Sequence, residues 1–184
     1  MQKYVGSFCA CVVICLAAAP QAAWAQEEPG PRDEHRVLQL ATAGSLLITA
    51  TLGTLTAINK PTLLSEGACA GGRPVLGDYG CHGLSILHGI SGLLSTVLYT
   101  ATLTLELSAF DWPGRDRHGG AYEALSYVHL IGMSGQALGG VIASFPEVVG
   151  ASRDGTFARV LRTLHIFTGY LIVGSFGITT AIEL

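Results

Sequence analysis

Two histidines, His88 and His165, occur in the same local pattern, Leu-His-x-x-Ser/Thr-Gly-x-Leu. Each pattern lies near the start of a long apolar run. An ionisable side chain is costly to place inside a membrane-spanning helix, so a histidine in such a helix is expected to have a function. Imidazole is a common ligand of transition metals. Two imidazoles in matching settings therefore predict one shared metal centre.

Haem iron is the metal that the surroundings favour. Gly92 and Gly169 each follow a histidine by four residues, one turn further along the same face of a helix. A position without a side chain leaves room for the macrocycle. A zinc ion needs further Cys, His or carboxylate ligands nearby, and the apolar runs offer no obvious set. We therefore expect one haem b, with His88 and His165 as axial ligands of the iron. The alternative is that both histidines pack inside the protein without a cofactor.

A third histidine, His129, lies in another apolar run and approaches from the opposite membrane face. A second haem there needs His35 or His118 as its partner, and both lie at or outside the predicted membrane boundary. This mismatch in depth favours one haem over two. If a second haem is present, Met133 or a residue of another subunit is the alternative partner of His129. Otherwise, His129 is a histidine of the protein interior that hydrogen-bonds a serine or threonine.

The propionates of a haem near the membrane surface need cationic partners. Arg162 is one of several cationic residues expected at the membrane face nearest His165. Arginine pairs with carboxylates through two parallel hydrogen bonds, which suits this role. The alternative for Arg162 is ordinary anchoring at the membrane interface.

The composition is that of a membrane protein. Charged residues make up 12% of the 184 residues, against about 25% in an average soluble domain, and the mean hydropathy is +0.48. The net charge of −3, with no cluster of lysines and arginines, excludes the electrostatic pattern of a nucleic-acid-binding protein.

Four apolar runs each reach the ~20 residues that a helix needs to cross a membrane. They cover about residues 37–58, 83–107, 121–145 and 160–182. Many of their positions carry glycine, serine or threonine, which allow transmembrane helices to pack closely. We therefore predict an all-α fold, a bundle of four transmembrane helices.

The first 25 residues have the layout of a secretory signal peptide. Lys3 precedes an apolar segment, Pro20 ends it, and small residues lead up to Ala25. We expect cleavage after Ala25, with an uncleaved signal anchor as the alternative. Residues 26–36 are predicted to be a polar extramembrane leader, and residues 37–184 the membrane domain.

An exported leader places the mature N-terminus outside the cytoplasm, in a multi-pass protein of the bacterial inner (cytoplasmic) membrane. The long loop at residues 59–82 then lies inside, and the distribution of lysine and arginine supports this orientation only weakly. Cys69 and Cys81, in that loop, favour the opposite, because disulfides persist in oxidising compartments. The two cysteines are either reduced thiols or a sign that the orientation is inverted.

Residues 83–182 resemble the cytochrome b561 superfamily and related small membrane b-type cytochromes. The resemblance rests on His88, His129 and His165 with the glycines near them. It implies that haem b is held between helices of a four-helix core by histidines on alternate helices. The family usually has four histidines and two haems, whereas a fourth histidine within the membrane is missing here. The resemblance therefore implies one haem, at His88 and His165, and leaves the second open.

These features predict an electron-transfer protein rather than a stand-alone enzyme. We expect it to pass single electrons between a quinone or membrane partner and a redox protein, such as a c-type cytochrome or a quinone-reactive complex. The sequence contains neither a Gly-rich nucleotide loop nor a Gly-x-Ser-x-Gly nucleophile motif. The alternative function is a cofactor-free structural or assembly subunit of a larger membrane (respiratory) complex.

Overall fold

The computed structural model describes residues 31–109 and 118–183, which form four long α-helices and one short 3-10 helix. The long helices are α2 (Pro31–Asn59), α3 (Gly77–Ala109), α5 (Gly120–Ser144) and α6 (Thr156–Glu183), and the 3-10 helix η1 covers Pro146–Val149. These two ranges contain no strand, so the all-α prediction is confirmed for them. The predicted signal peptide and residues 26–30 of the predicted leader lie outside the described residues.

Three of the helices are long and apolar enough to cross a membrane. These segments are Arg32–Asn59, Gly77–Ser108 and Thr156–Glu183. They agree with a multi-pass membrane protein. Helix α5, with 25 residues, forms where the third of the four spans was predicted, and its crossing of the membrane stays a prediction.

Three helices begin four or more residues earlier than the apolar runs indicate, and one of them is α6, which starts at Thr156 instead of residue 160. Helix α2 starts at Pro31 instead of residue 37, because proline fits the first turn of a helix and the acidic Asp33 and Glu34 complement the helix dipole there. Helix α3 starts at Gly77 instead of residue 83, with Asp78 in its first turn. The loop between α2 and α3 is therefore shorter than predicted and covers residues 60–76.

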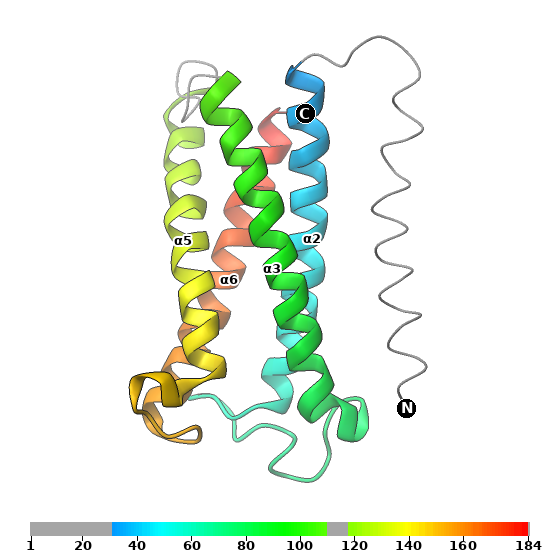
Figure 1. Ribbon diagram of the computed structural model, residues 1–184, viewed down its shortest axis with the longest axis vertical. Coiled ribbons are helices and arrows are strands. Elements are labelled where there is room, and N and C mark those ends of the chain that lie inside the picture. Colours follow the sequence, from blue (N-terminus) through cyan, green and yellow to red (C-terminus); the bar gives the residue numbers. More distant parts are fainter. Residues whose placement is uncertain (1–30, 110–117, 184) are drawn as a thin grey trace. The chain divides into compact units, whose positions relative to one another are not determined.

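All contacts described below lie within residues 35–184, which form one compact unit. Its four helices lie side by side, and consecutive helices run in opposite directions (Figure 1). Residues 60–76 and residues 145–155 connect helices at the same end of the bundle, which we call the loop end. The opposite end, where α3 and α6 finish, is called the His35 end after a residue in the first turns of α2.

Many buried side chains of the bundle are polar, and many exposed ones are apolar. The hydroxyl oxygens of Thr42 and Thr102 lie 2.9 Å apart between α2 and α3, and both side chains are buried. In contrast, Leu93, Ile131 and Leu138 are 68%, 71% and 70% exposed. Large exposed apolar surfaces are typical of sites of membrane or protein contact. Buried hydroxyl groups such as those of Thr42 and Thr102 hydrogen-bond between helices.

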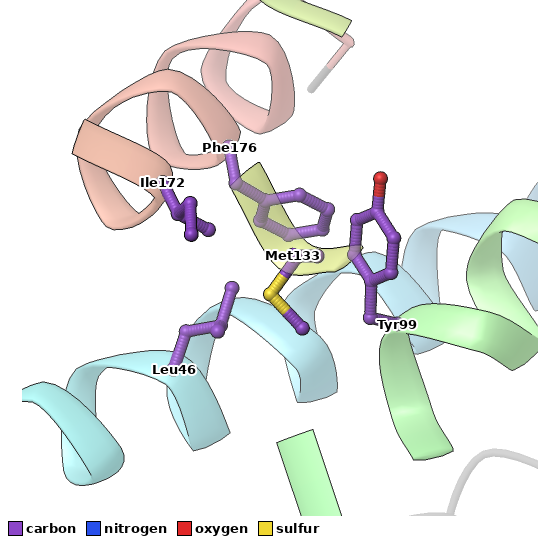
Figure 2. Close-up of a cluster of buried hydrophobic side chains, with 5 residues drawn as sticks. All are labelled: Leu46, Tyr99, Met133, Ile172 and Phe176. Atoms are coloured by element: carbon purple, nitrogen blue, oxygen red, sulfur yellow. The ribbon is translucent and has the colours of Figure 1, made fainter. Parts of the chain in front are cut away.

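A small apolar cluster joins the four helices near the middle of the bundle (Figure 2). It consists of Leu46, Tyr99, Met133, Ile172 and Phe176, each no more than 7% exposed. The cluster separates the polar groups near the loop end from those near the His35 end.

The loop of residues 60–76 is closed by Asn59, the last residue of α2. The buried side chain of Asn59 donates hydrogen bonds to the carbonyl oxygens of Val75 and Gly80, both at 3.0 Å, and accepts one from the Val75 N–H at 2.8 Å. A Cβ atom at Gly80 would overlap the Val75 carbonyl oxygen. A disulfide between Cys69 and Cys81 joins the loop to α3. Of the two states left open for these cysteines, the structure therefore has the disulfide.

The same loop is also fastened to α6. The N–H of Leu63 donates to the Thr163 hydroxyl oxygen at 3.0 Å. The guanidinium of Arg159 donates two hydrogen bonds to the carboxylate of Glu66, at 2.7 and 2.8 Å. The loop thus connects the end of α2 and the start of α3 to the start of α6.

Candidate metal centre

The structure brings His88 and His165 together. His88 lies on α3 and His165 on α6, and their ring centroids are 5.9 Å apart with the ring planes at 82°. Both side chains are partly buried. Counted from the first residues of α3 and α6, both histidines lie about three turns into their helices. Because α3 and α6 both start at the loop end (Figure 1), this similar depth allows the two rings to meet.

The ring of His88 is oriented by α2. Its Nδ1 atom lies 3.0 Å from the carbonyl oxygen of Thr49. Because a carbonyl oxygen only accepts, Nδ1 carries the proton and Nε2 has the free electron pair. A Cβ atom at Gly53, one turn further along α2, would lie 2.8 Å from Cε1 of His88. Thr49 therefore sets the tautomer of His88, and the absence of a side chain at Gly53 makes room for the ring.

The ring of His165 lies against α5. A Cβ atom at Gly140 would lie 3.0 Å from Cε1 of His165. Among the residues that the structure describes, no group hydrogen-bonds the buried Nδ1 atom of His165. The backbone carbonyl of His165 accepts a hydrogen bond of 2.7 Å from Gln136 of α5. The two histidines are therefore packed in the same way, because each ring fills the space beside a glycine of a neighbouring helix.

These residues fit a metal bound between the two rings. His88 and His165 would hold the metal through imidazole nitrogens, which are common ligands of transition metals. The rings lie in edge-to-face contact, with centroids 5.9 Å apart, so they come from two helices to one place. The hydrogen bond from His88 to Thr49 is the kind of contact that orients metal-bound histidines. Nδ1 of His165 is buried and has no hydrogen-bond partner among the described residues. Burial of such a polar atom is costly, and a metal bound to the ring would offset part of that cost.

The two glycines predicted to leave room for a macrocycle lie at helix contacts. A Cβ atom at Gly92 would lie 3.8 Å from Cγ2 of Thr49, and one at Gly169 would lie 2.8 Å from Nε2 of Gln136. The small size of Gly169 makes room for Gln136 of α5, whereas a Cβ atom at Gly92 would make only an ordinary contact with Thr49 of α2. Their contact with a cofactor stays a prediction.

Arg162 lies near the start of α6, at the loop end, where it was expected. Its guanidinium donates hydrogen bonds to the carbonyl oxygens of Pro61, at 3.1 Å, and Arg153, at 2.7 Å. These contacts join α6 to both connections at the loop end. The role of Arg162 as a propionate partner stays a prediction.

His129 belongs to a different part of the bundle. It is 7% exposed, and its Nδ1 atom lies 2.8 Å from the hydroxyl oxygen of Tyr99. Its ring packs edge to face on Tyr99 and Phe176, with centroids 5.6 and 5.3 Å away. We expected a serine or threonine as the partner of an interior His129, and the structure has a tyrosine instead. A second haem at His129 stays open.

The histidines considered as partners of His129 lie beside glutamates. Nε2 of His35 is 2.8 Å from Oε2 of Glu106, and Nε2 of His118 is 3.6 Å from Oε1 of Glu183. The sequence alone indicates none of these pairings, and it also does not indicate Gly53 and Gly140 as the glycines that face His88 and His165. Such pairings depend on how each helix is rotated in the bundle.

No protein-family model, curated protein or solved structure matches this chain. The functional argument therefore rests on the geometry of the side chains, and the resemblance to cytochrome b561 proteins stays a prediction.

Proposed function

We propose that this protein is a membrane-embedded b-type cytochrome that transfers single electrons, with one haem b held by His88 and His165. The observation that carries the proposal is the meeting of these two rings between α3 and α6, with centroids 5.9 Å apart. Two imidazoles from different helices, inside a bundle of apolar helices, are the ligand set of such a haem.

Each residue near the rings has a role in this proposal. His88 offers Nε2, because Nδ1 is engaged by the Thr49 carbonyl. His165 supplies the second nitrogen, and Gln136 holds the backbone of α6 at that point. Haem b bound by two imidazoles exchanges one electron at the iron, at a potential set by its ligands and their surroundings. In a membrane, the surrounding helices would give the partly buried rings a low-dielectric setting.

The rings lie closer to the loop end than to the His35 end, so we infer that electrons enter or leave through the loop end. A redox protein such as a c-type cytochrome, or a quinone-reactive complex, is the partner proposed there. We further propose the bacterial inner membrane as its location. The presence of three helices that can cross a membrane supports a multi-pass protein.

An optical spectrum of the purified protein tests the proposal, together with a pyridine haemochrome assay. We expect a haem b spectrum at one haem per chain in the unchanged protein, and loss of that spectrum in the His88→Ala and His165→Ala variants. His82→Ala is the matched control, because His82 is an exposed histidine of α3. Full spectra in both His88→Ala and His165→Ala would show that the ligands are assigned wrongly. A haem count of two that falls to one in His129→Ala would identify the second site.

One observation favours the cofactor-free alternative. His88 and His165 fit beside Gly53 and Gly140 of the neighbouring helices, and such contacts stabilise helix packing without any cofactor. A colourless preparation that contains no iron by elemental analysis, but melts at a lower temperature in the His88→Ala variant, would favour a structural or assembly subunit.

A further inference from the structure

Three ionisable side chains from three helices meet at the His35 end. Nε2 of His35 on α2 lies 2.8 Å from Oε2 of Glu106 on α3, and Nδ1 of His35 lies 3.3 Å from Oε2 of Glu183 on α6. The side chains of His35, Glu106 and Glu183 are 4%, 9% and 6% exposed. One candidate ligand atom from each residue lies within 4.8 Å of the other two.

Distances of this size suit a shared cation. Two ligand atoms at about 2.0–2.2 Å from one ion are at most about 4.4 Å apart, so small movements of these side chains bring all three to an ion. Only one nitrogen of His35 can bind the ion. The other nitrogen then donates to the remaining carboxylate oxygen, and this contact orients the ring as in many metal sites.

A fourth polar group points to a ligand independently. Gln39 lies one turn after His35 on α2, and it lines a small cavity that Glu106 and Tyr122 also line. Gln39 is 2% exposed, and within residues 31–109 and 118–183 no group hydrogen-bonds its Oε1 atom. A buried acceptor without a donor is costly, and a bound cation or its water would satisfy it.

The carboxylate of Glu183 is itself held in place. Its Oε1 atom accepts a hydrogen bond from the Tyr122 hydroxyl and lies 3.6 Å from Nε2 of His118. Its Oε2 atom remains directed toward His35. The site lies at the His35 end of the bundle, with His35 in the second turn of α2 and Glu183 in the last described turn of α6.

We propose that His35, Glu106 and Glu183 bind a divalent transition-metal cation, with Gln39 Oε1 as a further oxygen ligand. One imidazole and several oxygen ligands suit Zn²⁺, Mn²⁺ or Fe²⁺. This site lies at the opposite end of the bundle from His88 and His165 and is independent of the function proposed for them.

Titration of the chelator-washed, detergent-purified full chain with Zn²⁺ in a calorimeter tests this site. We expect one equivalent to bind the unchanged protein and the Glu147→Gln variant, which changes an exposed glutamate at the loop end. Glu106→Gln and Glu183→Gln keep the shape of the side chain and should weaken binding at least 10-fold, in line with the loss seen when even an outer partner of a metal site is removed. Gln39→Leu should weaken binding less.

Thermal unfolding of the same proteins separates lost binding from lost folding. Zn²⁺ should raise the melting temperature of the unchanged protein and of Glu147→Gln, and should leave those of Glu106→Gln and Glu183→Gln unchanged. The proposal is overturned if the unchanged protein binds no Zn²⁺, or if folded Glu106→Gln and Glu183→Gln bind it as tightly as the unchanged protein.

Discussion

The ring of His88 on α3 donates its Nδ1 hydrogen to the carbonyl oxygen of Thr49 on α2, at 3.0 Å. A side chain on one helix is thereby oriented by the backbone of another, where no side-chain substitution can remove the acceptor. The hydroxyl of Thr49 also lies 2.9 Å from that of Ser95 on α3. Helix α2 therefore shapes the candidate metal centre without contributing a ligand to it.

Gly53→Ala tests the space that α2 leaves for His88. The new methyl group would lie 2.8 Å from Cε1 of His88, so the ring or the helix must move, at a cost of about 1–3 kcal/mol. Gly44→Ala on the same helix is the control, because no atom lies within 4 Å of a Cβ there. We expect Gly53→Ala alone to lower the melting temperature and the haem content. Equal behaviour of the two variants would contradict a tight fit at Gly53.

Gln136→Leu tests the polar contact between α5 and α6 beside His165. Gln136 donates to the His165 carbonyl and accepts from the Thr168 hydroxyl, both at 2.7 Å. Loss of both bonds should reduce the free energy of unfolding by about 1–2 kcal/mol. Ser134→Ala is the control, because among the described residues the Ser134 hydroxyl bonds only its own helix, at the Leu130 carbonyl. Chemical denaturation in detergent measures both variants, and an effect of Ser134→Ala as large as that of Gln136→Leu would argue against this role.

Asn59→Ala tests how the loop of residues 60–76 is held. The variant removes three hydrogen bonds of a fully buried side chain, which should cost about 1–3 kcal/mol. The Cys69–Cys81 disulfide spans 12 residues and should contribute about 3 kcal/mol in the chain-entropy view. We expect limited proteolysis to cut the loop only when Asn59→Ala is combined with reductant. Cleavage of the unchanged protein by protease and reductant alone would show that Asn59 does not hold the loop.

The contact between Glu66 and Arg159 should respond to acid. Two hydrogen bonds from the Arg159 guanidinium, and its charge, hold the pKa of Glu66 below the ordinary value of 4.5. Because the pKa is lower in the folded state, the ionised carboxylate stabilises the folded loop, and this stabilisation is fully present above pH 4.5. The stabilisation is lost as the pH falls through the lowered pKa and Glu66 becomes protonated. Titration of the Glu66 carboxyl followed by NMR should show this low pKa, and Arg159→Gln should return it to the ordinary value. A pKa unchanged by Arg159→Gln would contradict the contact.

The disulfide makes a prediction about orientation. Because disulfides persist in oxidising compartments, Cys69 and Cys81 predict that the loop end faces the exported side, the reverse of the orientation predicted from residues 1–25. The test uses intact cells and a variant in which the three cysteines before residue 16 are serine. We expect a membrane-impermeant maleimide to label the loop after an impermeant reductant is added. Labelling only after the cells are broken would restore the original orientation.

The positions of the helices and the meeting of the two histidine rings follow from simple features of the sequence. Runs of about 20 apolar residues predict the helices, and the matched positions of His88 and His165 in two of these runs predict that the rings meet. Both inferences depend only on helical rise and on the alternation of direction along the chain. The early starts of α2 and α3 were missed because a helix can continue past its apolar part, through polar residues such as Asp33 and Asp78.

The finer contacts depend on the rotation of each helix, which the sequence does not reveal. Nothing in the chain distinguishes Gly53, which faces His88, from Gly44, which faces no atom within 4 Å. The same holds for His129, which bonds Tyr99 rather than a serine or threonine, and for His35, which meets Glu106 and Glu183. These partners come from other helices, so only the packed bundle identifies them.

The fastening of the loop to α6 has a consequence for the order of assembly. Glu66 and Leu63 find their partners on α6 at sequence separations of 93 and 100 residues, whereas His88 finds Thr49 only 39 residues away. During synthesis, the hairpin of α2 and α3 can orient the first imidazole well before α6 emerges. The arrival of α6 then supplies His165 and adds the contacts of Leu63 and Glu66 with α6. A chain that stops before α6 would therefore have His88 already oriented by Thr49, but a loop without its contacts to α6.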